Sequence, residues 1–89
     1  MDVIDVKYLD GYKLEVTFED GKVILADFTD FLKKSLHPAI TKYRKLSLFK
    51  KVTVDKVRGC LEWNKGEMDI NPYTLYEGRS KGISVVNIK

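Results

Sequence analysis

The fold is decided by residues 61–76, which read Leu-Glu-Trp-Asn-Lys-Gly-Glu-Met-Asp-Ile-Asn-Pro-Tyr-Thr-Leu-Tyr. The stretch begins with a short apolar strand that contains Trp63, and Gly66 predicts a tight turn that leads into an acidic loop. Asn71 is a favoured helix N-cap and Pro72 a favoured first helical residue, so a helical turn is expected next. A strand, a turn and a helical turn this close together indicate a small domain that mixes both kinds of secondary structure.

Upstream of this stretch, the first 27 residues predict an antiparallel meander with one apolar face. Residues 12–18 alternate strictly between apolar and polar side chains, which is typical of a half-buried strand. A three-residue loop that ends at Gly11 would place Ile4 opposite Val16, and this register keeps the apolar side chains on one face. A two-residue Asp-Gly turn after the strand would place Leu25 opposite Val16 from the other side.

Two short helices are expected in the middle of the chain. Apolar side chains at helical spacing occur at Phe28, Phe31, Leu32 and Leu36. Thr29 or Asp30 is expected to cap the first helix, and the His-Pro pair at 37–38 is expected to end it. Pro38 can itself begin a second helix. A short turn then brings Phe49 into the core.

The remaining strands lie near the end of the chain. A fourth and a fifth strand are expected to pair Val54 with Leu61. The segment from Ile83 to Ile88 is rich in β-branched residues, so it is expected to pair with a sheet edge. That edge belongs either to its own chain or to a second copy, and the second alternative would make a homodimer. We therefore expect a single domain over residues 1–78 and a tail over residues 79–89 with an extra strand.

Taken together, these elements predict an α+β fold: a twisted, mainly antiparallel sheet of about five strands with two short helices packed on one face. Its 89 residues suit one domain with a small core. The composition is that of a folded protein, with 44% hydrophobic and 33% charged residues. A single cysteine, early charged residues and the lack of a long apolar run predict a cytoplasmic protein that does not enter a membrane.

The layout resembles the bacterial family catalogued as domain of unknown function 2442. The matching marks run from about Val3 to Tyr76 and are Leu14-x-Val16-x-Phe18-x-x-Gly21, Phe49-x-x-Val52, Leu61-Glu62-Trp63-x-x-Gly66 and Asp69-Ile70-x-Pro72-x-x-Leu75-Tyr76. The family has no assigned activity, and so it offers no catalytic residues to carry over. Some of its members lie beside another small protein, in an arrangement similar to toxin–antitoxin pairs. The resemblance therefore implies a protein partner, such as a small toxin-like protein, and an antitoxin-like role.

Catalytic chemistry finds little support in the residues. His37 is the only histidine, and its place before a proline suggests a structural or surface role. Cys60 is the only thiol and is expected on the outward face of its strand, without a catalytic role. Zinc is excluded because it needs three or four such ligands. Oxygen ligands for a hard cation exist at Glu62, Glu67 and Asp69, but they lack calcium-loop spacing, so no metal or other cofactor is expected.

The charge distribution offers an alternative to a protein partner. Residues 33–58 contain nine basic residues and one acidic residue, whereas the rest of the chain contains seven basic and twelve acidic residues. Such a segment either solvates a surface or binds an anionic partner, and nucleic acid is the alternative we consider. Tyr8, Tyr12, Trp63 and Tyr76 fall on predicted inward faces, whereas Tyr73 is expected to be exposed for stacking. The residues expected to contact an anionic partner are Lys42, Arg44, Lys45, Lys50, Lys51 and Arg58.

Overall fold

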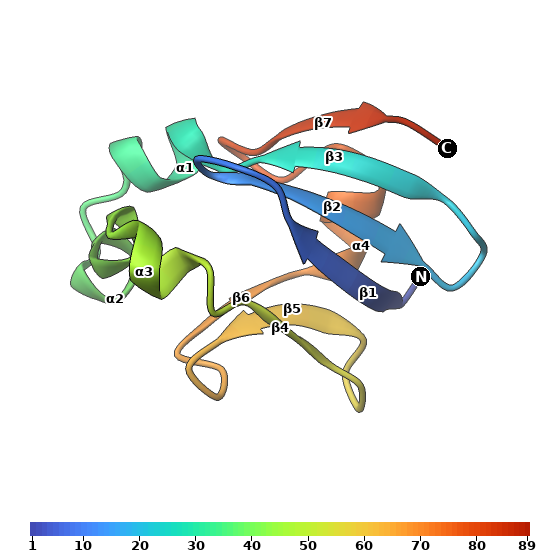
Figure 1. The fold of residues 1–89 in the computed structure, drawn as a ribbon, viewed down its shortest axis with the longest axis horizontal. Coiled ribbons are helices and arrows are strands. Elements are labelled where there is room, and N and C mark those ends of the chain that lie inside the picture. The colour runs from blue at the N-terminus through green and yellow to red at the C-terminus, as the bar shows by residue number, and fades with distance from the viewer.

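A computed structural model describes residues 1–89 and confirms the expected α+β class, with seven strands in two antiparallel sheets (Figure 1). The larger sheet has the strand order β1-β2-β3-β7, and the smaller sheet has the order β4-β5-β6. The elements in chain order are β1 (Val3–Tyr8), β2 (Lys13–Phe18), β3 (Val23–Asp27), α1 (Thr29–Lys34), α2 (Pro38–Thr41), the 3-10 helix η1 (Lys42–Arg44), α3 (Leu46–Phe49), β4 (Thr53–Asp55), β5 (Cys60–Trp63), β6 (Met68–Ile70), α4 (Pro72–Tyr76) and β7 (Ser84–Asn87).

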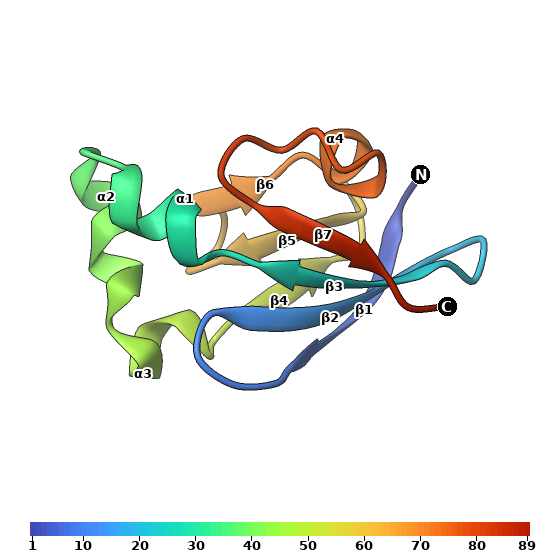
Figure 2. The same cartoon turned by 90° about the horizontal axis from the view of Figure 1, so that it is seen from above.

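The two sheets face each other across the core, and the helices fill the gaps at their margins. Helices α1, α2 and α3 gather at one end of the molecule, where the chain passes from β3 to β4 (Figure 1). Helix α4 lies on the side of β6 and β7, as the view from above shows (Figure 2). No helix combines the length and the apolar character that crossing a bilayer requires.

The first hairpin differs from its predicted register. Val6, and not Ile4, lies opposite Val16, because the three-residue loop lies one residue further along the chain: the Leu9 amide donates to the Lys13 carbonyl at 3.1 Å, so residues 10–12 form the loop. The ladder is also irregular between Val3 and Asp5. Such a bulge shifts the alternation of side chains by one residue. As a result Val3 is buried in the core, whereas Ile4 is 54% exposed.

The second hairpin also differs from its prediction. Ile24, rather than Leu25, lies opposite Val16. The reason is that the loop spans residues 19–21, with Gly21 at φ +92°, so it is one residue longer than the expected turn. A slip of one residue exchanges the two faces of a strand. Ile24 therefore points into the core, and Leu25 lies on the outer face.

The helices begin largely where the sequence predicts. Pro38 begins α2 as expected. The predicted cap of α1 at Thr29 or Asp30 is wrong, because the Asp27 carboxylate accepts hydrogen bonds from the Thr29 amide at 2.9 Å and from its hydroxyl at 2.6 Å. The expected place of Leu36 in the first helix is also wrong. Helix α1 ends before this residue, whose side chain is 95% exposed.

The smaller sheet is built from β4, β5 and β6. Val54 lies opposite Leu61, as predicted. The acidic loop expected after Gly66 is wrong, because this segment contains β6, in which Met68 pairs with Trp63. Two buried side chains, at positions 68 and 70, flank a single exposed residue in this strand. Three residues are too few for the alternation to be recognised in a sequence.

The end of the chain completes the larger sheet. The Asn71 side chain accepts a hydrogen bond from the Tyr73 amide at 2.8 Å and caps α4, and Pro72 is the first residue of that helix, as predicted. Strand β7 then pairs antiparallel with β3 of its own chain, with Val86 opposite Leu25. The predicted strand at the end of the chain is thus present, and it joins the sheet made by the first 27 residues.

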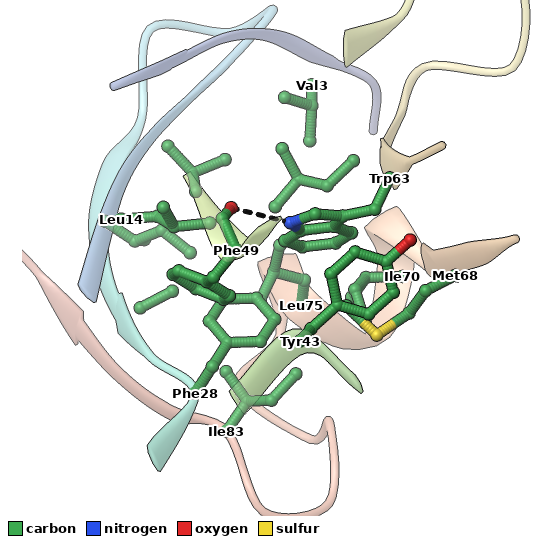
Figure 3. Close-up of a cluster of buried hydrophobic side chains, with 14 of the residues drawn as sticks. Val3, Leu14, Phe28, Tyr43, Phe49, Trp63, Met68, Ile70, Leu75 and Ile83 are labelled. Carbon is green, nitrogen blue, oxygen red and sulfur yellow. Dashed lines mark hydrogen bonds between the residues drawn. The ribbon is translucent and has the colours of Figure 1, made fainter. Parts of the chain in front are cut away.

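The core between the sheets is built around aromatic rings (Figure 3). Trp63 is fully buried, and its indole N–H donates a hydrogen bond to the Phe49 carbonyl at 2.8 Å. The rings of Phe28 and Phe49 each lie 5.7 Å from the Trp63 ring, centroid to centroid. No buried side-chain nitrogen or oxygen lacks a hydrogen-bond partner. The core thus satisfies its polar atoms while it excludes water.

Replacing Trp63 separates the contribution of its ring from that of its N–H group. Trp63→Ala is expected to cost about 3–5 kcal/mol, which a domain of this size hardly tolerates. Trp63→Phe keeps an aromatic ring but leaves the Phe49 carbonyl with only the longer hydrogen bond from the Val52 amide, at 3.3 Å, so a loss of about 1–2 kcal/mol is expected. Urea unfolding followed by circular dichroism measures both losses. Tyr73→Ala is the control, since this ring is 61% exposed, and an equal loss from Tyr73→Ala and Trp63→Phe would contradict the assignment.

Candidate functional site

The fold divides the predicted basic surface into residues that are bonded within the chain and residues that face solvent. Lys42 forms an ion pair, Arg44 binds backbone carbonyls, and Arg58 is surrounded by carboxylates. Lys45 and Lys51 are exposed, and Lys50 lies over the ring of Tyr8, 5.3 Å from its centroid. Three of the six side chains are therefore bonded to carboxylates or carbonyls of the chain.

Arg44 closes the C-terminal end of α1. Its Nε donates to the Leu32 carbonyl at 2.8 Å, and its Nη2 donates to the carbonyls of Lys33 at 2.8 Å and Ser35 at 3.1 Å. The last carbonyls of a helix have no partner within the helix, and a cation favours their negative end. This guanidinium therefore has a structural role that its position in a basic run did not reveal.

Arg58 lies at the centre of an acidic surface on the outer face of the smaller sheet. Its guanidinium lies 2.8 Å from Asp55, 3.1 Å from Asp69 and 3.7 Å from Glu62. Hydrogen bonds from Arg58 hold the pKa of Asp55 below its usual value, and hydrogen bonds to Asp55 and Asp69 raise the pKa of Arg58 further. Three carboxylates around one guanidinium leave this surface negative, which is unfavourable for a phosphate backbone.

Glu67 connects the helical end to the β5–β6 turn. Its Oε1 accepts from Lys42 Nζ at 2.7 Å, from the Tyr43 hydroxyl at 2.7 Å and from Asn64 Nδ2 at 3.2 Å. These donors, Lys42 first, lower the pKa of Glu67 to about 2. Burial and the adjacent carboxylate raise the pKa of Tyr43 to about 12. The sequence identifies Glu67 only as a conceivable metal ligand. It gives no sign that Glu67 accepts these three hydrogen bonds.

The candidate catalytic residues are used for structure. His37 Nδ1 accepts a hydrogen bond from the Ala39 amide at 3.1 Å, so it caps α2. Cys60 lies on the face of β5 opposite Leu61 and outside the main core cluster, as expected, but it is only 5% exposed and lines a hollow together with Pro72 and Tyr73. Burial raises the pKa of the Cys60 thiol, which disfavours the reactive thiolate. No group of three or more histidine, cysteine, aspartate or glutamate side chains converges in a way that could hold a metal ion.

A different set of residues surrounds the largest hollow of the surface. This hollow has a volume of about 450 Å³ and lies where η1, the start of β4 and the β5–β6 turn meet. It brings together Lys42 and Lys51 of the predicted set. It also includes Lys65, which sequence reasoning missed because this lysine lies outside the basic run. Only the folding of the β5–β6 hairpin places Lys65 near the other two.

The role of Arg44 can be tested by the change Arg44→Gln. Loss of the three bonds to the end of α1 is expected to reduce the free energy of unfolding by about 1–2 kcal/mol. The neighbouring change Lys45→Gln removes the same charge from an exposed side chain and should alter stability by less than about 0.5 kcal/mol. Urea unfolding at neutral pH compares them. Similar losses in both variants would assign the effect to net charge instead.

The ion pair of Glu67 makes a prediction about acid stability. Because its folded pKa is about 2 and its ordinary value is 4.5, its stabilising contribution is complete above pH 4.5 and disappears as the pH falls to about 2. The difference in unfolding free energy between the wild type and Glu67→Gln should therefore be largest above pH 4.5 and shrink across this window. Thermal unfolding at several pH values measures this difference. A difference that does not change with pH would rule out the ion pair as its source.

The comparisons with known proteins agree with the resemblance carried by the sequence motifs. The sequence model of one family, described as a protein of unknown function (DUF2442), matches residues 3–81 and so includes both sheets except β7. No curated protein and no solved structure matches the chain significantly. Because the match covers most of the 89 residues, this chain belongs to the DUF2442 family of proteins of unknown function.

Proposed function

We propose that this chain is a non-catalytic binding module, and that a partner protein adds an extended segment to the free edge of β7. Strand β7 is the last strand of the larger sheet, and within the chain it pairs only with β3. An edge strand presents a row of unpaired backbone groups, and strand addition is a common way in which proteins bind extended segments. The free edge is the observation that carries this proposal.

The side chains of β7 support this use of the edge. Proteins usually protect an exposed edge with charged residues, proline or a bulge. The segment from Ile83 to Ile88 contains no charged residue and no proline. On its outer face Val86 is 56% exposed and Ile88 is 47% exposed, and Leu25 of β3 lies opposite Val86. A partner strand would extend this apolar row.

The charges at the two ends of the strand indicate which partner fits. Lys81 precedes the strand and Lys89 follows it. An apolar segment with acidic residues at its ends would complement both lysines. A second copy of this chain, aligned antiparallel on β7, would bring its own lysines close to them, and like charges across strands are destabilising. The favoured occupant is therefore a different protein with an acid-flanked apolar strand.

The antitoxin-like role implied by the family resemblance is one form of this proposal, in which a small toxin-like protein carries the segment. The single cysteine suits the reducing cytoplasm, where we place the interaction. Nucleic acid is the less well supported partner, because Arg44 and Arg58 are bonded within the chain.

Photo-crosslinking in cells tests this proposal. A benzoylphenylalanine side chain is introduced at Val86 or, as a matched control, at Ile4, which is 54% exposed on the opposite edge strand β1. We expect a covalent product with another protein from position 86 only. Mass spectrometry of that product should place the crosslink in an apolar segment with acidic flanks.

A synthetic peptide of the crosslinked segment then tests strand addition itself. The peptide should bind the purified chain, and N-methylation of alternate backbone amides, which removes the donors but keeps the side chains, should abolish binding. Products of equal yield from positions 86 and 4 would contradict the proposal. A product between two copies of the chain would replace it with a homodimer through Ile83 to Ile88.

A further inference from the structure

We propose that the lysine-lined hollow beside the β5–β6 turn binds a small polyanion of the diphosphate class. Its volume of about 450 Å³ falls within the range of about 300–1,000 Å³ that is usual for small-ligand pockets. Lys42, Lys51 and Lys65 line it from three separate segments, together with Thr53. A polar, cationic lining of this kind suits an anion rather than an apolar ligand. The site is separate from β7, so it does not depend on the function proposed above.

The positive charge in the hollow is only partly neutralised by the chain. Lys42 is paired with Glu67. The carboxylate of Glu62 also lines the hollow, and it shares the single Arg58 guanidinium with two aspartates. The three lysines therefore face two carboxylates and keep an excess of positive charge. By contrast, Lys51 and Lys65 take part in none of the ion pairs of the structure. Two ammonium groups therefore remain available, and an ammonium binds phosphate oxygens as a compact charge with several donors.

The backbone of the turn provides a second, independent observation. Asn64 has φ +50° and Lys65 has φ +57°, so two consecutive residues that are not glycine adopt the left-handed conformation. Asparagine tolerates this conformation, but a long side chain is disfavoured there. The Glu67 amide donates to the Asn64 carbonyl, so Lys65 and Gly66 are the two central residues of the turn, and glycine, asparagine or aspartate is usual at the first of them. Backbone strain of this kind is concentrated at functional sites. Lys65 thus occupies a position where glycine would fold more easily, and its side chain lines the hollow.

The rim of the hollow is held in place before any ligand arrives. Glu67 accepts hydrogen bonds from both Lys42 and Asn64, which joins η1 to the β5–β6 turn. The buried ring of Tyr43, whose hydroxyl also donates to Glu67, fixes η1 on the core. A preformed rim lowers the entropic cost of ordering side chains around a ligand. Glu67 is therefore a positioning residue in this proposal and not itself a contact for the anion.

The test is a titration of the full chain with inorganic pyrophosphate at low salt. The NMR chemical shifts of the backbone amides monitor binding. Saturable shifts are expected around residues 51–53 and 64–66. Lys51→Gln and Lys65→Gly should each raise the Kd about three- to tenfold, as expected for loss of one charged contact at a half-exposed site. Lys7→Gln is the matched control, since it removes one lysine charge from β1, and it should leave the Kd unchanged.

The change Lys65→Gly also separates binding from folding. Because it relieves the left-handed strain, it should raise the midpoint of urea unfolding while it weakens pyrophosphate binding. Weakened binding with unchanged or higher stability cannot result from a damaged fold. The proposal is overturned if no saturable shifts occur or if the shifts lie away from the hollow. It is also overturned if Lys65→Gly binds pyrophosphate as tightly as the control Lys7→Gln.

Two further ligands identify the source of the anion. An equal Kd for adenosine diphosphate and pyrophosphate assigns the hollow to a free polyanion, whereas a tighter Kd for the nucleotide assigns it to a nucleotide diphosphate group. Both results support the proposal. A short single-stranded DNA that binds more tightly than either, and loses affinity in Lys51→Gln, overturns it in favour of a nucleic-acid backbone.

Discussion

The contact of the Trp63 indole with the backbone of α3 is the interaction on which the rest of the structure depends. Trp63 comes from the smaller sheet, and Phe28, which packs against it, directly follows the third strand of the larger sheet. The indole also donates to the Phe49 carbonyl in α3. One side chain therefore joins the smaller sheet to the residue that follows β3 and to the helical end, and its N–H group donates to a carbonyl of a fully buried residue. Its large buried ring matters because a chain of this length has only a small core.

The shape of this core determines where the charged residues lie. The inner faces of both sheets are used for the core, so polar side chains occupy the outer faces and the turns. On the smaller sheet this arrangement collects Arg58 and its carboxylates. At the helical end, Arg44 and Lys42 are bonded to a helix terminus and to Glu67. A basic run in the sequence thus becomes several local networks, and its net charge overstates what is available to a partner.

Two features remain that the needs of folding do not explain. The β7 edge lacks the charges that usually protect an edge strand. The β5–β6 turn has a lysine in a left-handed conformation. They lie on different sheets and differ in chemistry. The β7 edge offers unpaired backbone groups and apolar side chains, whereas the β5–β6 turn borders a hollow lined by lysines. Protection against edge-to-edge association would favour a charged residue in the first, and an unstrained turn would favour glycine, asparagine or aspartate in the second. We propose that both features serve binding, each with its own kind of ligand.

The sequence by itself determined the α+β class, the paired fourth and fifth strands, the Asn71 cap and the family, because these depend on local signals such as alternation and capping chemistry. Tertiary structure decided the registers of the first three strands, since a bulge near Val3 and one extra loop residue change which side chains face inward. Tertiary structure also determined which lysine and arginine side chains have no ion-pair partner within the chain. The positions of Lys51 and Lys65 beside one hollow arise from segments that are distant in the chain, and no local pattern records such proximity.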